Sequence, residues 1–227
     1  MTSSATTTER QVSITAGGHR LAGALIVPPG AAGVVVFAHG RGSGRFSPRN
    51  QFVAHTLQAG GLATLLIDLL DEAEAETRDK VFDIELLAER VQAAANWVRR
   101  DAATKQMRIG YFGASTGAAA ALVAAARQPA AVGAVVSRGG RPDLAVEDLP
   151  SVQAPTLLIV GGDDNVVITL NQEALNCLRC TKELVIIPGA THLFPERGAL
   201  EEVARLAQRW FSRHLVNNAS PAVAGRS

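Results

Sequence analysis

Short apolar runs that lack polar alternation recur along this chain and restrict the folds it can adopt. From Val34 onward they are apolar at nearly every position, the pattern of strands covered on both faces of a parallel sheet. The expected strands are 12–14, 21–27, 34–37, 63–67, 107–112, 132–136, 157–160 and 184–187. We expect the first two to form an antiparallel hairpin at one edge of the sheet.

Helical periodicity fills most of the intervals between these runs. It is clearest after Asp83, a suitable N-cap, where apolar residues follow the spacing of one helix face. The expected helices are 51–59, 84–98, 115–127, 170–178 and 199–215. Strands and helices therefore alternate as in a doubly wound α/β domain.

The length and charge of the chain set further limits. With 227 residues, 47% of them hydrophobic, we expect one domain over residues 11–215, with disordered tails at 1–10 and 216–227. A formal charge of +1 provides no field to hold a nucleic acid. We find no secretory signal and no apolar stretch of roughly 20 residues, so a cytoplasmic location without membrane contact is expected. Cys177 and Cys180 are interpreted as packing residues, because one isolated pair is a weak metal signal.

A strand that turns sharply into a helix is predicted around Gly113-Ala-Ser115-Thr-Gly117. Glycines on both sides remove Cβ atoms that would clash in a strained turn, and the turn lifts the serine hydroxyl above the sheet edge. Such a pentapeptide can arise by chance in a chain rich in glycine and alanine. The flanking strand and helix are the context in which it carries a nucleophile. We therefore predict Ser115 as the nucleophile and the Thr116 backbone amide as an oxyanion donor.

A second glycine-rich loop, His39-Gly-Arg41-Gly-Ser-Gly44, follows a buried strand upstream of Ser115. Acyl-transfer enzymes with a nucleophile elbow take their second oxyanion donor from a loop in this place, so we assign it to the Arg41 amide. His39 is expected to brace the loop and not to act as the base. The loop matches neither a phosphate-binding loop nor a dinucleotide-binding loop.

Two later loops offer the partners that a serine nucleophile needs. One follows a buried strand and contains Asp163 and Asp164, and the other follows the last strand and contains His192. After an elbow serine, the triad order is acid and then histidine, so His192 is predicted as the base. We predict Asp164 as the acid because it occupies the fourth place of a Gly-x-x-Asp-x-x-Val pattern, and Asp163 as a turn residue.

Together these motifs resemble the dienelactone hydrolase-like branch of the α/β-hydrolase superfamily over residues 10–215. The runs that carry the resemblance are 47–50, 113–121, 137–143 and 188–194, which are similar to bacterial hydrolases sometimes fused to a phosphoribosyltransferase domain. The resemblance implies an α/β-hydrolase fold with a mostly parallel central sheet of about eight strands, helices on both faces and no large cap domain. It also implies ester or lactone hydrolysis with no metal and no organic cofactor. Dienelactone hydrolases proper carry a cysteine where this chain has Ser115.

Several arginines fall in loops expected to meet at the carboxyl edge of the sheet. Guanidinium groups bind carboxylates and phosphates with two-point geometry, so we predict a substrate with an anionic group near the scissile bond. The candidate substrate-binding residues are Arg45, Arg49, Arg138 and Arg141. Alternatively, these side chains are solvated or form internal ion pairs with Asp68 and Asp143.

The predicted activity is hydrolysis of a small-molecule carboxylic ester or lactone through an acyl-serine intermediate. A thioesterase or an acyltransferase would use the same triad, and the sequence does not separate these reactions. The alternative from another class is a binding module that keeps the fold without turnover. A homodimer and a phosphoribosyltransferase partner are further predictions.

Overall fold

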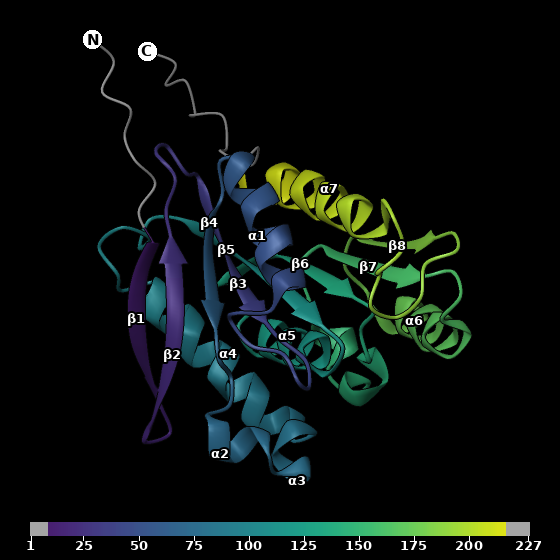
Figure 1. The fold of residues 1–227 in the computed structure, drawn as a ribbon, viewed down its shortest axis with the longest axis horizontal. Coiled ribbons are helices and arrows are strands. Elements are labelled where there is room, and N and C mark those ends of the chain that lie inside the picture. Colours follow the sequence, from purple (N-terminus) through teal and green to yellow (C-terminus); the bar gives the residue numbers. More distant parts are fainter. Residues whose placement is uncertain (1–8, 217–227) are drawn as a thin grey trace, which may run out of the picture.

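The computed structural model describes residues 9–216, and one eight-stranded sheet forms its centre (Figure 1). The strands lie in the order β1-β2-β4-β3-β5-β6-β7-β8. They are β1 (Glu9–Ala16), β2 (His19–Ile26), β3 (Gly33–Ala38), β4 (Ala63–Ile67), β5 (Arg108–Ala114), β6 (Val132–Arg138), β7 (Thr156–Gly161) and β8 (Lys182–Ile187). β1 and β2 form an antiparallel hairpin, β2 pairs antiparallel with β4, and the remaining pairs are parallel. The predicted mostly parallel sheet and edge hairpin are confirmed.

Helices cover both faces of this sheet, as predicted (Figure 1). On one face lie α1 (Pro48–Ala59) and α7 (Ala199–Phe211), and on the other lie α4 (Ile84–Val98), α5 (Thr116–Arg127) and α6 (Asn165–Cys177). Four shorter helices complete the fold: α2 (Glu72–Ala75), α3 (Arg78–Val81) and two 3₁₀ helices, Pro142–Ala145 and Leu149–Ser151. A π-helical turn, Ser212–Val216, follows α7. Within the described residues no large cap domain covers the sheet edge, and no helix is long and apolar enough to cross a membrane.

The helix α5 is the most deeply buried of the helices because it is built from small residues. Its residues from Thr116 to Ala125 are all buried, and six of the ten are alanine. Alanine has the highest helix propensity and leaves room for close approach. The helix therefore packs between the sheet, α4 and the 3₁₀ helices, and provides a rigid base for the turn that precedes it.

The boundaries differ from the sequence-based prediction in a few places. α6 begins at Asn165 and not at residue 170, because the β-branched run from Val166 to Thr169 has low helix propensity and obscured the start of the helix. α1 begins at Pro48, since proline is well tolerated in the first turn of a helix. Glu9 and Arg10 belong to β1, and Val216 belongs to the π-helical turn, so none of the three is part of a tail. The predicted tail residues 1–8 and 217–227 lie outside the described residues.

A buried ion pair attaches the short helices α2 and α3 to α4. The Arg90 guanidinium donates from Nη1 and Nη2 to the two carboxylate oxygens of Glu74, at 2.6 and 2.7 Å, and also donates to the Leu69 carbonyl oxygen. Lys80 Nζ lies 2.9 Å from Glu74 Oε1. Hydrogen bonding from Arg90 holds the pKa of Glu74 well below its usual range, against the opposing effect of burial. Helices of only four residues are unstable alone, so this pair provides much of their stability.

We expect Glu74→Gln to lower the free energy of unfolding by about 3 kcal/mol, because it leaves the buried Arg90 charge without its partner. Urea unfolding measures the loss. Glu76→Gln is the matched control, since Glu76 is exposed and only two residues away, and should change stability by less than about 0.5 kcal/mol. Equal effects of the two substitutions would show that the ion pair contributes nothing.

Candidate active site

Ser115 occupies a strained turn between β5 and α5. Its backbone has φ 52° and ψ −123°, a conformation that residues with a Cβ rarely adopt. The surrounding chain holds it there, since the Ser115 amide donates to the Arg138 carbonyl oxygen at 3.3 Å and the Arg141 amide donates to the Ser115 carbonyl oxygen at 3.2 Å. The serine is half-buried, so its side chain is accessible from the carboxyl edge of the sheet.

The glycine-rich loop after β3 packs directly on this turn. A Cβ at Gly40 would lie 2.8 Å from Ser115 Cβ and from the Ala114 carbonyl oxygen. A Cβ at Gly117 would overlap the carbonyl oxygens of Ala38 and His39. Only glycine fits at these two points. The loop and the serine turn can therefore pack closely, which places the Arg41 amide beside the serine.

The two predicted oxyanion donors lie on these two segments. Within residues 9–216, neither the Arg41 amide nor the Thr116 amide donates a hydrogen bond to a protein acceptor. Thr116 is the first residue of α5, where helix geometry leaves amides unpaired and the helix dipole favours negative charge. Both amides are therefore free to bind an oxygen that develops negative charge.

Asp164 and His192 form a short hydrogen bond across the ends of β7 and β8. His192 Nδ1 lies 2.6 Å from Asp164 Oδ2. The two loops are held together by the Asp163 amide, which donates to the Ala190 carbonyl oxygen at 2.9 Å. The Asp163 amide thus joins the two loops, whereas the Asp164 carboxylate contacts the histidine. A carboxylate at Nδ1 fixes the imidazole tautomer that leaves Nε2 free to accept a proton.

His192 lies next to the serine turn. A Cβ at Gly139 would be 3.5 Å from both Nδ1 and Cε1 of the His192 ring, and Gly139 directly follows the residue whose carbonyl accepts the Ser115 amide. The His192 side chain is 40% exposed, whereas Asp164 is 16% exposed. The structure thus places Ser115, Asp164 and His192 at one edge of the sheet.

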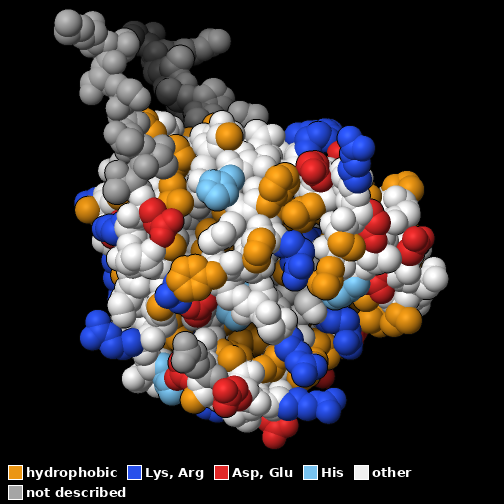
Figure 2. Space-filling model, in the orientation of Figure 1, with side chains coloured by type: hydrophobic (Ala, Val, Ile, Leu, Met, Phe, Trp, Pro, Cys, Tyr) orange, Lys and Arg blue, Asp and Glu red, His pale blue; other side chains and the backbone are white. Residues whose placement is uncertain are grey.

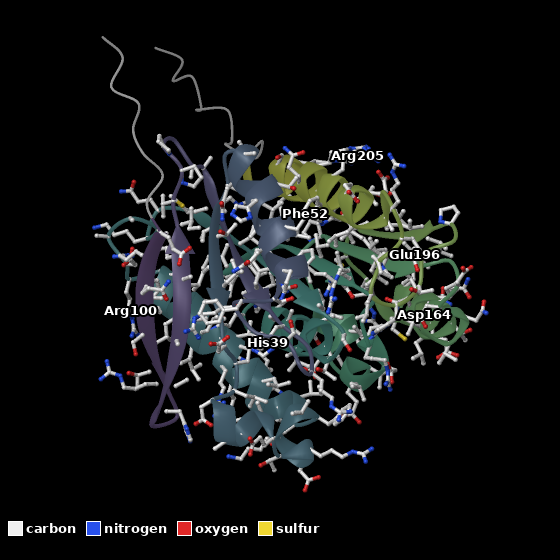
Figure 3. All side chains as sticks on the ribbon, in the orientation of Figure 1. His39, Phe52, Arg100, Asp164, Glu196 and Arg205 are labelled. Carbon is white, nitrogen blue, oxygen red and sulfur yellow. The ribbon has the colours of Figure 1, made fainter. Side chains whose placement is uncertain are left out.

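His39 is engaged in structural contacts on the other side of the serine. Figure 3 labels His39 and Asp164, which follow β3 and β7 on either side of β5 and β6. The Leu69 amide donates to His39 Nε2 at 2.8 Å, and Nδ1 lies 3.0 Å from the Gly40 carbonyl oxygen. With Nε2 accepting, the proton sits on Nδ1 and is donated to that carbonyl. Burial lowers the pKa of His39, so the ring is neutral and braces the loop, as predicted.

We expect His39 to make the protein less stable as the pH falls. The unfolded histidine takes up a proton below its ordinary pKa of 6.5, whereas the buried ring resists protonation. This stabilisation is complete above pH 6.5 and is lost progressively at lower pH. His39→Gln removes the titrating group, so it should reduce the loss of unfolding free energy between about pH 7.5 and pH 5.0 by on the order of 1 kcal/mol.

Urea unfolding of both proteins at the two pH values measures this difference. Burial also lowers the pKa of His214, but that residue is present in both proteins and its contribution cancels. Identical pH dependence in the two proteins would contradict the neutral, buried His39.

The four candidate substrate-binding arginines separate into two groups. Arg45 forms an ion pair with Asp68, and Arg141 forms a two-point pair with Asp143 at 2.8 and 2.7 Å. For these two the alternative of internal pairing is correct. The structure therefore does not bring all four arginines together at the site.

The other two arginines have no carboxylate partner among the described residues. Arg49 lies in the first turn of α1, and Arg138 is the last residue of β6. Within residues 9–216 neither side chain forms an ion pair, and Arg49 Nε and Arg138 Nη1 are buried without a hydrogen-bond partner. Burial and, to a smaller extent, the positive charge of Arg49 lower the pKa of Arg138 to about 10. Arg138 therefore stays charged at neutral pH, and with Arg49 nearby the two guanidinium groups are suited to bind an anion.

A cavity of about 430 Å³ opens beside the serine turn. Its catalytic end is lined by Gly40, Arg41 and Thr116, and Arg49 also lines it. The remaining wall is largely apolar and includes Phe46, Pro48, Leu70, Ala75, Val81 and Leu87. Figure 2 shows hydrophobic side chains on the floor of a hollow in the lower half of this face, with basic side chains beside it. Sequence reasoning missed this wall, since its residues come from segments far apart in the chain, such as Phe46 and Val81.

One cluster could be considered for a metal. In the described part of the chain, ligand atoms of His19, Asp71 and Glu74 lie within 4.8 Å of one another. Glu74 already accepts hydrogen bonds from Arg90 and Lys80. These two cations oppose a divalent ion at the same carboxylate. Cys177 and Cys180 are free thiols and half-buried, in keeping with packing roles.

A mostly parallel sheet with this strand order and a strained serine after its strand β5 define an α/β-hydrolase fold. The chain belongs to the dienelactone hydrolase family, whose model matches residues 22–216.

Solved structures support the same class. A dienelactone hydrolase from Anabaena variabilis is 56% identical, with a TM-score of 0.90 over 92% of this chain and 99% of that chain. Est1E from Butyrivibrio proteoclasticus is 17% identical, with a TM-score of 0.77 over 90% of this chain and 98% of that chain, a likeness that shows the fold. The chain therefore shares the family of the first of these proteins and the fold of both.

Longer relatives also match. A Mycobacterium tuberculosis protein with the provisional name of a phosphoribosyl transferase is 55% identical over 207 residues, which are 91% of this chain and 47% of that protein. This chain thus spans about half the length of these relatives.

Proposed function

We propose that this protein hydrolyses carboxylic esters or lactones through a Ser115–His192–Asp164 triad and an acyl-serine intermediate. The observation that carries the proposal is the 2.6 Å hydrogen bond between Asp164 and His192, next to a serine in a strained turn. Strain of this kind persists only where the surrounding structure enforces it, and it is concentrated at functional sites.

The reaction begins when His192 Nε2 accepts the proton of the Ser115 hydroxyl as Oγ attacks the carbonyl carbon of the substrate. The carbonyl oxygen becomes an oxyanion and accepts hydrogen bonds from the Arg41 and Thr116 amides. Protonated His192, stabilised by Asp164, then gives its proton to the leaving alkoxide. Water attacks the acyl-serine with His192 again as base, which releases the acid and restores Ser115.

We expect Ser115→Ala to lower kcat for p-nitrophenyl acetate and butyrate by at least about a thousandfold, because the nucleophile is removed. Asp164→Asn should lower it strongly as well, since it disturbs the tautomer of His192, whereas Asp163→Asn should have little effect. Steady-state kinetics on the folded variants measures these changes.

Intact mass after treatment with a fluorophosphonate provides a second measurement. One covalent adduct on the wild type and none on Ser115→Ala would support the triad. A folded wild type that neither turns over esters nor takes up the label would favour a binding module on the hydrolase fold.

We also propose that the substrate carries an anionic group, which Arg49 and Arg138 bind. Support comes from the buried Arg138 and the half-buried Arg49, neither of which forms an ion pair with a carboxylate in the described part of the chain. An anion between them would offset both the desolvation of Arg138 and the mutual repulsion of the pair. Arg45 and Arg141 have no part in this proposal, because internal carboxylates already neutralise them.

Arg49→Gln should lower kcat/KM for an ester with a free carboxylate by roughly tenfold relative to a neutral ester of the same size, because a charge-assisted hydrogen bond is lost. Arg141→Gln is the matched control and should leave this ratio unchanged. Competition between p-nitrophenyl hydrogen succinate and p-nitrophenyl butyrate measures it. Equal hydrolysis of the two esters by wild type would count against an anionic substrate.

We also propose a phosphoribosyltransferase as a partner of this chain, because the longer mycobacterial relatives carry that name and this chain matches about half of their length. A homodimer and a cytoplasmic location stay predictions.

A further inference from the structure

The cavity beside Ser115 lies on one side of the reacting centre. Among the described residues that line it are Gly40, Arg41 and Thr116, which carry or support the oxyanion donors, but not Asp164 or His192. β3 and β4 lie on one side of β5, and β6, β7 and β8 lie on the other. The cavity therefore occupies the β3 side of the serine, and the imidazole occupies the opposite side.

The chemistry of the proposed triad assigns the two halves of an ester to these two sides. The leaving alkoxide must lie beside His192, because it receives the proton from Nε2. The carbonyl oxygen must point at the Arg41 and Thr116 amides. The acyl chain then extends away from the imidazole, on the β3 side of Ser115. We infer that the cavity is the acyl-binding site, an inference that rests on the proposed triad.

The far wall of this site is apolar and rigid. Leu70, Val81 and Leu87 line it and are themselves almost fully buried, at 8%, 5% and 2% exposure. They come from the segment after β4, from α3 and from α4, which the Arg90–Glu74 ion pair holds together. Burying each methylene of an acyl chain against such a wall favours binding by roughly fourfold. The substrate class is therefore an ester or lactone whose acid has an apolar body larger than acetyl.

Arg49 lines the same cavity. An anionic group on the substrate would therefore belong to the acid and not to the alcohol. The leaving-group side is different in character, since the His192 side chain is 40% exposed and Leu193 beside it is 47% exposed. Alcohols that leave there are not enclosed, so the site discriminates among acids much more than among alcohols.

Val81 allows a test because a change in its size alters the length of the cavity. The measurement compares kcat/KM for two ester series. In the acyl series p-nitrophenol is constant and the acid runs from acetate to octanoate, and in the alcohol series butyrate is constant and the alcohol runs from methyl to hexyl. The variants are Val81→Phe and Val81→Ala. The matched control is Val146→Phe, on an exposed residue outside the cavity lining.

We expect the hexanoate-to-acetate ratio to fall at least about tenfold in Val81→Phe and to shift toward longer acids in Val81→Ala, while Val146→Phe keeps the wild-type ratio. The alcohol series should vary less than about threefold in all four proteins. A hexanoate-to-acetate ratio that the Val81 variants leave unchanged would overturn the inference, as would a shift confined to the alcohol series. In both cases the wild type would still hydrolyse esters, so the proposed function would stand. If the folded wild type hydrolyses no ester, the proposed function fails and the inference fails with it.

Discussion

The first turn of α5 lies against the end of β3 at a distance that only glycine permits. Gly117 faces the carbonyl oxygens of Ala38 and His39, and Gly40 faces the Ser115 side chain. The position of the Arg41 amide relative to Ser115 follows from these two contacts. The buried, alanine-rich body of α5 keeps them in place, since it is packed on all sides and has no room to shift. The reactive turn is therefore a property of the central packing and not of a flexible loop.

The histidine and its acid depend on the same sheet in a different way. Each is carried by a loop after a parallel strand, and parallel strands bring such loops to one edge. Because β7 and β8 are neighbours, the Asp163 amide can bond to Ala190 and set Asp164 against His192. His39 follows β3, the neighbour of the strand that leads to Ser115, but its Nε2 accepts a hydrogen bond from the Leu69 amide and is unavailable as a base.

Much of this arrangement could be predicted from the sequence because its signals are local. An apolar strand, a glycine turn and a helix identify Ser115 within a short segment, and chain order then selects Asp164 and His192. The arginines could not be sorted in this way, because pairing is a long-range property: Arg45 meets Asp68 across 23 residues, whereas Arg49 meets no carboxylate among the described residues. The short helices α2 and α3 were missed for the same reason, since the Arg90–Glu74 ion pair joins residues 16 apart.

The position of α2 and α3 has a consequence for how such a protein can diverge. These helices belong to the crossover between β4 and α4, outside the sheet and remote in sequence from the elbow and from the histidine loop. Mutation there alters the shape of the cavity wall without disturbing the strand ends that hold the reacting groups. Selectivity and reactivity are thus encoded in separate stretches of the gene, and a lineage can exchange one acid for another through a few changes between residues 70 and 87.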